Sequence, residues 1–373
     1  MTLREVLKSL DWIMLGAVIL LILVSLAMLF SGTDAQDLTD SRFTRQGIAA
    51  GIASAGLIAA AYVPYHTLRR YALLLYALGL ASLGGVLVWG RVIRGTTSRI
   101  TLAGFQIQPS EFMKLALVIA LAWLLSRTTN LSWRRILGSA VLAAVPTALI
   151  GLEPDLGVAF LFITLWGGLM IFLGLSWRAL AALTLLAALA SAGIWQWALV
   201  DYQKARLEVF MDPSSDPLGA GYNVTQSIIA FGSGRLIGRG LGHGPQSQLQ
   251  FLPERDTDFI LASIGEELGF VGVVLVIFLY AIVLWRILRV INLTRDRFGQ
   301  LLAAGVFLLL LASASVSAGM NIGLLPVTGL PLPLLSYGGS NLLSTALMIG
   351  LVQSIIVHSK WTQAPPRELS YLA

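Results

Sequence analysis

Three carboxylates stand close together in a chain that otherwise contains few charges: Glu254, Asp256 and Asp258. They end the segment Gln246-Ser-Gln-Leu-Gln-Phe-Leu-Pro-Glu-Arg-Asp-Thr-Asp258, just ahead of a long apolar stretch. Ionisable groups at membrane depth are costly, so such a cluster is a candidate functional site. Asp258 is the carboxylate that we expect to act in chemistry, as a base that removes a proton.

A structural interpretation of the same residues stays open. Thr257 and Asp258 could instead cap the helix that begins there, since short polar side chains accept hydrogen bonds from the first backbone N–H groups. Glu266 and Glu267, about two helical turns further along, are expected to be structural partners rather than catalytic groups.

Glu111 and Lys114 form a second charged pair, in Gln108-Pro-Ser-Glu-Phe-Met-Lys114. A spacing of three places both side chains on one face of a helix, so they can form an ion pair. The pair could simply fix helix packing. It could also line a substrate cavity, where Lys114 would help to hold a phosphate.

Two connections could either turn the chain or bind substrate. Glu153-Pro-Asp155-Leu-Gly157 predicts a tight turn in which Asp155 caps the following helix. The glycine-rich segment from Thr225 to Gly244 carries Arg235 and Arg239, and it lacks the Gly-Lys-Ser/Thr ending of a nucleotide-binding P-loop. Its N–H groups and guanidinium groups could cradle a pyrophosphate, or the segment could only turn over the membrane surface.

The segment Pro326-Val-Thr-Gly-Leu-Pro-Leu-Pro-Leu-Leu-Ser336-Tyr-Gly-Gly-Ser340 is apolar, but its prolines and glycines prevent a continuous helix. Irregular backbone at membrane depth requires surrounding protein or a water-filled cavity. We therefore predict a re-entrant segment at about 326–340 that lines an outward-facing cavity with Ser336 and Ser340. A plain surface loop is the alternative.

These residues must be positioned by a membrane domain. Of the 373 residues, 57% are hydrophobic and 12% are charged, which excludes an ordinary soluble protein. We predict an all-α, single polytopic domain over residues 1–373 with ten membrane-spanning helices and a large outer loop at about 199–257. The predicted spans are roughly 11–31, 46–63, 70–90, 109–126, 136–152, 156–174, 178–198, 258–285, 299–323 and 341–358.

The Lys and Arg residues predict the orientation and exclude some partners. They are densest in the short segments that would share a side with the N-terminus, so both termini are expected in the cytoplasm and Asp258 outside. They form no basic patch, so a nucleic-acid partner is not expected, and nucleotides are absent from the outer side. The chain has no cysteine and only three histidines, which argues against thiolate or histidine metal sites.

Several motifs together resemble the SEDS family (shape, elongation, division and sporulation proteins) over nearly the whole chain. They are Gln108-Pro-Ser-Glu-Phe-Met-Lys114, Glu153-Pro-Asp-Leu-Gly157, Asp216-Pro-Leu-Gly-Ala-Gly-Tyr222, Thr257-Asp-Phe-Ile260, Gly265-Glu-Glu-Leu-Gly269, Gly323-Leu-Leu-Pro-Val-Thr-Gly329 and Ser336-Tyr-Gly-Gly-Ser340. The segment Gln246-Ser-Gln-Leu-Gln-Phe-Leu-Pro resembles the elongation branch of the family rather than the division branch.

The resemblance implies a peptidoglycan glycosyltransferase of the bacterial plasma (inner) membrane that polymerises lipid II during cell elongation. Asp258 matches the essential aspartate of the family, and Glu111 and Lys114 match a pair near its cavity. The expected partners are a class B penicillin-binding protein, which is a transpeptidase, and other proteins of the elongation complex.

The chain departs from the family pattern at three places. A tryptophan expected near Ile100 is missing from Gly95-Thr-Thr-Ser-Arg99-Ile100. Ser317 stands where an asparagine is usual, and Asp256 stands where a histidine is common. Asp256 adds a negative charge beside Asp258.

The implied reaction needs no nucleotide, because the lipid-linked donor already carries a pyrophosphate leaving group. Asp258 would deprotonate the acceptor hydroxyl, with inversion at the donor sugar. The leaving group would need cations, for which Lys114, Arg206, Arg235 and Arg239 are candidates, and a divalent cation (Mg²⁺ or Mn²⁺) could serve instead or as well. A flippase for the same lipid, or a non-catalytic scaffold that activates a transpeptidase, are the alternatives.

Overall fold

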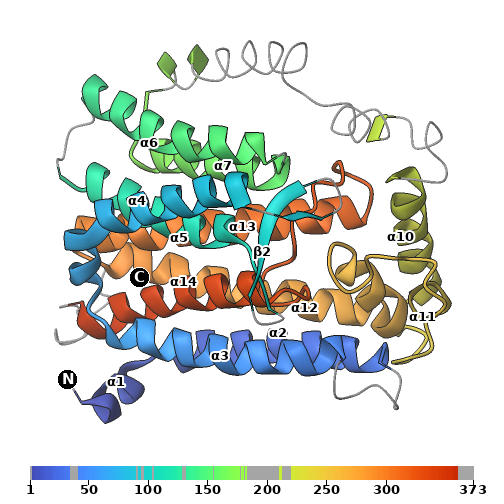
Figure 1. The fold of residues 1–373 in the computed structure, drawn as a ribbon. Helices are drawn as coiled ribbons and strands as arrows, with labels where there is room; N and C mark the ends of the chain where they lie inside the picture. The colour runs from blue at the N-terminus through green and yellow to red at the C-terminus, as the bar shows by residue number, and fades with distance from the viewer. Residues whose placement is uncertain are drawn as a thin grey trace.

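The computed structural model is nearly all-helical, with long helices lying side by side (Figure 1). It describes residues 2–33, 41–89, 91–93, 96–102, 105–127, 132–153, 155–176, 178–179, 181–182, 210–211 and 220–359. Within these residues, six helices are long and apolar enough to cross a membrane: α2 (Trp12–Ser31), α4 (Tyr65–Trp89), α6 (Trp133–Leu152), α12 (Ile260–Leu293), α13 (Arg297–Asn321) and α14 (Gly339–His358). The other helices described are α1 (Leu3–Ser9), α3 (Arg42–Tyr62), α5 (Pro109–Leu125), α7 (Leu156–Phe172), α10 (Ala220–Gly234) and α11 (Pro245–Gln248).

Every predicted span except 178–198 coincides with one of these helices, with ends that differ by several residues. Residues 178–198 lie mostly outside the described part of the chain, so the count of ten spans stays a prediction. The predicted outer loop at 199–257 includes two helices in its described part, α10 and α11.

A small sheet corrects the strictly all-α prediction. It consists of β1 (Arg91–Ile93), β2 (Thr96–Leu102) and β3 (Phe105–Ile107), which pair antiparallel in the order β1-β2-β3. The sequence suggested only a connection here. Three threonines and one isoleucine stand among the seven residues of β2, and such β-branched residues favour strands. The strands carry the chain from the end of α4 to the start of α5.

Short polar side chains begin several helices by accepting a hydrogen bond from the first turn. Asp155 accepts from the N–H of Val158 at 3.1 Å, which confirms the predicted cap of α7. The same arrangement starts four further helices, α1 at Thr2, α2 at Asp11, α3 at Ser41 and α13 at Asp296. Pro109 occupies the first turn of α5.

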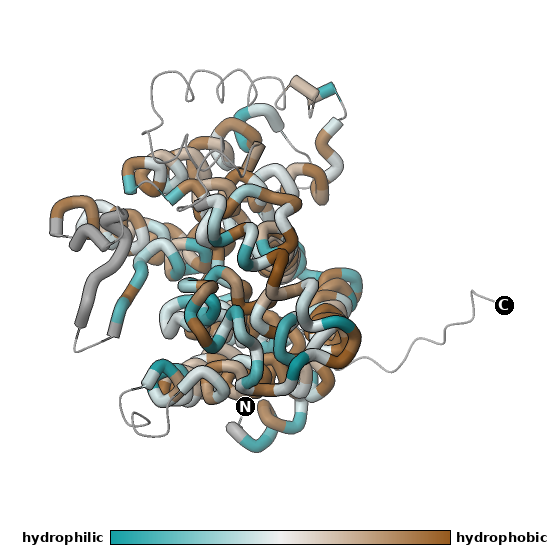
Figure 2. Tube along the Cα trace, turned by 90° about the vertical axis from the view of Figure 1, so that its right-hand side faces the viewer, coloured by the Kyte–Doolittle hydropathy of each residue, from teal (hydrophilic) through white to brown (hydrophobic). Residues whose placement is uncertain are grey.

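Helix α14 forms the centre of the bundle. Of its most apolar stretch of 18 residues, 83% is buried. It packs against α3, α5 and α13. By contrast, only 22% of the most apolar 18-residue stretch of α4 is buried, and its Leu74 and Leu78 side chains are exposed. Figure 2 shows hydrophobic residues (brown) throughout the bundle. Apolar side chains on the outside of the bundle are what a lipid environment permits.

Helix α12 is interrupted at Gly269, whose φ of 67° and ψ of −165° are not helical. An interruption leaves backbone N–H and C=O groups without partners inside the helix. Residues 235–240 supply those partners. The hydrogen bonds run from Phe270 N–H to Arg235 C=O (2.9 Å), from Val271 N–H to Leu236 C=O (3.1 Å), from Arg239 N–H to Glu266 C=O (3.0 Å) and from Gly240 N–H to Glu267 C=O (2.9 Å).

This junction requires glycine. A Cβ atom on Gly269 would lie 2.2 Å from the backbone nitrogen of Gly238, and one on Gly238 would lie 2.1 Å from the carbonyl oxygen of Glu267. Both residues also have positive φ, which is strained for other side chains. Residues 235–240 and the two halves of α12 therefore form one unit.

We expect Gly269→Ala to lower the free energy of unfolding by at least about 2 kcal/mol, because its Cβ meets backbone and its φ and ψ are almost restricted to glycine. Thermal unfolding of the detergent-solubilised protein measures the change. Gly16→Ala in α2 is the matched control, since no atom lies within 4 Å of its Cβ position. Equal unfolding midpoints for the two variants would contradict the role of the junction.

Candidate active site

Asp258 is partly exposed and lies in the turn that leads into α12. The N-cap residue of α12 is Phe259, and no side chain of its own caps the helix. The cap position therefore belongs to Phe259, and Thr257 and Asp258 precede it in the turn.

Asn321, the last residue of α13, caps α12 from a neighbouring helix. Its Oδ1 accepts from the N–H of Ala262 at 2.9 Å, and its Nδ2 donates to the C=O groups of Asp258 and Ser317, both at 2.8 Å. The side chain is fully buried. Asn321 thus attaches the backbone of Asp258 to α13. The sequence analysis missed it, although an amide inside the apolar span 299–323 was an available signal.

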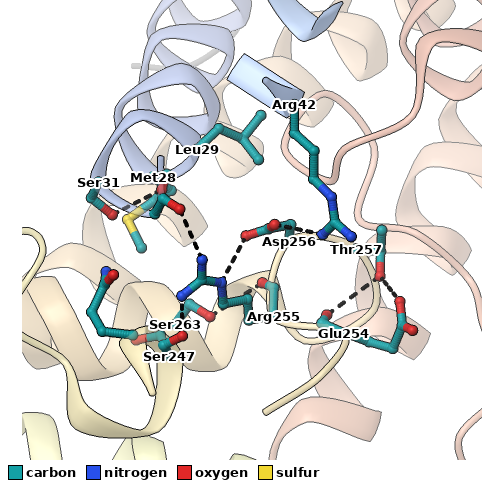
Figure 3. A network of polar contacts seen from close by, with 12 residues as sticks. Met28, Leu29, Ser31, Arg42, Ser247, Glu254, Arg255, Asp256, Thr257 and Ser263 are labelled. Carbon is teal, nitrogen blue, oxygen red and sulfur yellow. Dashed lines mark hydrogen bonds and ion pairs between the residues drawn. The ribbon is translucent and has the colours of Figure 1, made fainter. Parts of the chain in front are cut away.

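Arg255 joins three segments next to the Asp258 turn (Figure 3). Its guanidinium group donates to the C=O of Ser247, and at 3.1 Å to the C=O of Gly32, the residue that follows α2. Its Nε lies 3.5 Å from Oδ1 of Asp256. Because only 13% of the side chain is exposed, these contacts hold the turn against α11 and the end of α2.

Asp256 lies between two guanidinium groups. Arg42 of α3 contacts its Oδ2 at 2.6 Å, on the side opposite Arg255 (Figure 3). From the sequence, Asp256 was expected to add a negative charge beside Asp258. The two cations offset that charge, so its effect on Asp258 is smaller than the sequence spacing suggests.

The segment 326–338 contacts the other side of the turn. Ser336 Oγ donates to the C=O of Thr257 at 2.6 Å and accepts from the N–H of Leu332 at 2.8 Å. The N–H of Tyr337 donates to the C=O of Asp256 at 2.8 Å. The Ser336 hydroxyl therefore holds the backbone of Thr257 and Leu332 in place, and both of these hydrogen bonds are made within the protein.

Side chains from three helices pair the backbone of this segment. Ser25 Oγ donates to the C=O of Leu335 at 2.5 Å, and Gln46 bonds both the C=O of Ser336 (3.3 Å) and the N–H of Gly338 (3.2 Å). Tyr280 donates to the C=O of Pro333. Protein surrounds the segment, as irregular backbone within a membrane requires.

The Glu111 and Lys114 side chains form a buried ion pair, with Nζ 2.6 Å from Oε2 and side-chain exposures of 4% for Lys114 and 2% for Glu111. The same oxygen accepts from Asn341 Nδ2 at 3.2 Å and from Ser344 Oγ at 2.9 Å. A buried pair needs such additional hydrogen bonds to offset its desolvation. The predicted pairing is confirmed, and α14 supplies the additional donors.

Ser340 belongs to the same region. Its Oγ accepts from the N–H of Gln108 at 3.1 Å and donates to the C=O of Gln106 at 3.0 Å. Residues 336–344 therefore contact both the Asp258 turn and the start of α5, which carries the buried ion pair.

Asp155 and Glu153 lie beside the start of α5. Asp155 Oδ2 accepts from Gln108 Nε2 at 3.3 Å. Glu153 is buried, and burial, followed by the charge of Asp155, raises the pKa of Glu153 to about 8. Its carboxyl group is therefore largely protonated at neutral pH.

Glu266 and Glu267 are buried and accept hydrogen bonds from the loop that follows the α12 junction. The donors to Glu266 are the N–H groups of Gln246 (2.8 Å) and Ser247 (2.9 Å) and Ser247 Oγ (2.5 Å); those to Glu267 include the N–H of Gly242 (3.1 Å), Gln248 Nε2 (2.8 Å) and Ser31 Oγ (2.9 Å). The structural role predicted for both residues is confirmed. Within the predicted cradle at Thr225–Gly244, the N–H groups of Arg239, Gly240 and Gly242 donate to oxygens of Glu266 and Glu267, so these three are not available to a pyrophosphate.

The structure describes two of the three arginines that were predicted to bind substrate. Arg235 and Arg239 are exposed, and their backbone groups belong to the α12 junction. Arg206 lies outside the described residues. Within the described part of the chain, no group of three or more His, Cys, Asp or Glu side chains could hold a metal ion, so the residues do not form a ready site for a divalent cation.

Removing the Asn321 side chain should loosen the Asp258 turn. We expect Asn321→Ala to lower the free energy of unfolding by about 1–3 kcal/mol, because it leaves buried backbone groups unpaired. Hydrogen exchange at residues 258–262 should accelerate. Ser317→Ala is the control, since its buried hydroxyl has no hydrogen-bond partner in the described structure. Unchanged exchange in Asn321→Ala would contradict the capping role.

The buried ion pair allows a double-mutant test. Lys114→Met leaves the Glu111 carboxylate without its cation and should cost about 3–5 kcal/mol of unfolding free energy. Adding Glu111→Gln should recover most of that loss, because the remaining neutral group still accepts from Asn341 and Ser344. Additive effects in chemical unfolding would show that the two charges are not coupled.

Comparison with known proteins places this arrangement in a family. Residues 8–361 match the family model of the FtsW, RodA and SpoVE cell cycle proteins. The peptidoglycan glycosyltransferase MrdB of Escherichia coli K12 is 42% identical over 273 residues, which cover 73% of this chain and 74% of MrdB. The probable peptidoglycan glycosyltransferase FtsW of Geobacter metallireducens is 33% identical, with 85% of each chain covered.

Solved structures agree with this relationship. A chain from a peptidoglycan synthase complex that coordinates polymerization and crosslinking superposes with a TM-score of 0.81 at 31% identity, covering 93% of this chain and 97% of that one. The rod shape determining protein RodA of Thermus thermophilus gives a TM-score of 0.70 at 28% identity, with coverage of 93% and 96%. With a family model that spans nearly its whole length, the chain belongs to the FtsW/RodA/SpoVE family, the SEDS proteins.

Proposed function

We propose that this protein is a peptidoglycan glycosyltransferase that polymerises lipid II into glycan strands during cell elongation, with Asp258 as the general base. The membership of the family and the similarity to MrdB, a peptidoglycan glycosyltransferase, support the activity. The observation that carries the assignment of the base is the position of Asp258. Asp258 is partly exposed. Asn321 donates a hydrogen bond to the backbone C=O of Asp258, and Ser336 donates one to the backbone C=O of Thr257.

In the proposed reaction, the carboxylate of Asp258 takes the proton of the 4-hydroxyl group of the acceptor GlcNAc. The hydroxyl oxygen attacks C1 of the donor MurNAc, and the bond from C1 to the lipid pyrophosphate breaks. The anomeric centre is inverted, and the electron pair of the broken bond leaves with the pyrophosphate. A backbone held from two sides suits this role, since a base must stay within hydrogen-bond reach of its proton.

The leaving pyrophosphate needs positive charge. Lys114 is buried and paired with Glu111, so its charge is already compensated. Arg235 and Arg239 are exposed at the α12 junction and are better candidates, together with Arg206. A divalent cation would need the pyrophosphate itself as a ligand, because the described side chains offer no cluster for it.

The proposal includes the orientation and the partner. Both termini lie in the cytoplasm of this inner-membrane protein, and Asp258 faces outward, as the distribution of Lys and Arg predicts. A class B penicillin-binding protein supplies crosslinking, alongside other elongation proteins. The similarity to a chain from a synthase complex that joins polymerization and crosslinking supports such a partner.

A lipid II flippase is the second candidate. The buried ion pair of Glu111 and Lys114 favours it, because intramembrane charges often mark transport pathways. The additional hydrogen bonds to Glu111 from α14 favour a structural pair instead.

The test is glycan polymerisation from purified lipid II, with and without the cognate transpeptidase carrying an inactivated active site. We expect Asp258→Asn to reduce the rate at least about a hundredfold, which is the typical contribution of a general base. Asp256→Asn removes a carboxylate two residues away that only pairs with Arg42 and Arg255, and we expect it to retain most activity.

Each result has one meaning when both variants unfold at the wild-type temperature. Polymer from wild type and Asp256→Asn but not from Asp258→Asn supports the base. Full activity of Asp258→Asn rejects Asp258 as the base but keeps the enzyme. No polymer from wild type, even with the partner, shifts the function to lipid transport or to scaffolding.

A further inference from the structure

A basic cavity of about 470 Å³ lies at the end of the bundle where α4 begins and α5 ends. This end is opposite α10 and α11 (Figure 1). The proposed reaction does not use it. Its lining comprises His66, Arg69, Arg70, Leu73, Trp123 and Arg127. We call these six residues the basic pocket.

The spacing of the α4 residues directs them to one place. Positions 66, 69, 70 and 73 follow the i, i+3, i+4, i+7 pattern, so they share one face of the helix. Arg127 follows the end of α5 and approaches from the neighbouring helix, with its guanidinium carbon 3.8 Å from the centre of the Trp123 ring. Three arginines therefore converge on one concavity.

The described part of the chain provides no carboxylate partner for these arginines. Among the described residues, no ion pair joins Arg69, Arg70 or Arg127 to an acidic side chain, whereas His66 lies 3.9 Å from Asp296. Asp296 also caps α13 through Gly299. His66, Arg69 and Arg70 moreover lie in the first two turns of α4, at the end of the helix where its dipole favours anions over cations. An anion in the pocket would offset the charge of the arginines and would also interact favourably with the dipole of α4.

The surroundings of the pocket are apolar on one side. Leu73 lines it, and next to it α4 exposes Leu74 and Leu78. Trp123 adds an aromatic ring at the level of the helix ends, where aromatic residues typically meet lipid headgroups. Positive charge at a helix end and an exposed apolar strip along the same helix match the two parts of a phospholipid.

We propose that the basic pocket binds the phosphate headgroup of an anionic phospholipid, whose acyl chains lie along the exposed leucines of α4. Basic pockets between membrane helices are a recognised form of headgroup site. The forked guanidinium groups suit phosphate oxygens. The site is separate from the Asp258 turn, and the proposal requires only that the protein resides in a membrane.

The experiment measures lipids retained by the purified full-length protein, by native mass spectrometry, with phosphatidylglycerol, cardiolipin or phosphatidylcholine added. The pocket variant is Arg69→Gln/Arg70→Gln/Arg127→Gln. The control is Arg4→Gln/Arg289→Gln/Arg295→Gln, which removes three charges at the same end outside the pocket. Thermal unfolding checks that each variant is folded, and Arg127→Gln alone replaces the triple variant if that one is not.

We expect the pocket variant to bind phosphatidylglycerol and cardiolipin at least about tenfold more weakly, while the control binds as wild type does. Phosphatidylcholine should bind weakly to all three. Equal losses in the pocket and control variants would overturn the proposal, because the arginines would then act only through overall charge. Displacement of the lipid by millimolar glycerol phosphate would overturn it in favour of a soluble anion.

Discussion

The interruption of α12 is the constraint on which the candidate active site depends. Backbone groups at a helix break inside an apolar bundle must be paired, and residues 235–240 pair them. That requirement determines where the following loop lies. The loop then supplies N–H donors to Glu266 and Glu267, and its Ser247 carbonyl accepts from Arg255. A continuous series of contacts thus runs from a helix break to the residue three positions before Asp258.

The Asp258 turn is also held from the opposite side, by Asn321 and Ser336. These two side chains bond backbone carbonyls, so they can hold the turn without bonding the carboxylate of Asp258. A base with a fixed backbone and a partly exposed side chain suits catalysis, because the conformational entropy of positioning the base is lost during folding and not during the reaction. The non-helical segment 326–338 contributes Ser336 and is itself paired by Ser25, Gln46 and Tyr280.

The sequence predicted what depends on local pattern. Apolar stretches located the helices, the spacing of Glu111 and Lys114 predicted their pair, and Asp155 was identified as a cap. It did not predict contacts between distant segments. Asn321 acts on α12 from α13, and Arg42 meets Asp256 across 214 positions. No local rule distinguishes such residues from ordinary polar side chains. The strands at 91–107 were missed because the segment is short and lies between two strong helical patterns.

Charged side chains are paired differently at the two ends of the bundle. Near Asp258, cations and carboxylates are matched: Asp256 lies between Arg42 and Arg255, and the buried glutamates receive several donors. At the other end, Arg69, Arg70 and Arg127 converge without carboxylates from the described residues. Unmatched arginines at helix ends interact with anionic lipid surfaces. Charge therefore stabilises the fold around the proposed base, whereas at the opposite end it is available for the membrane.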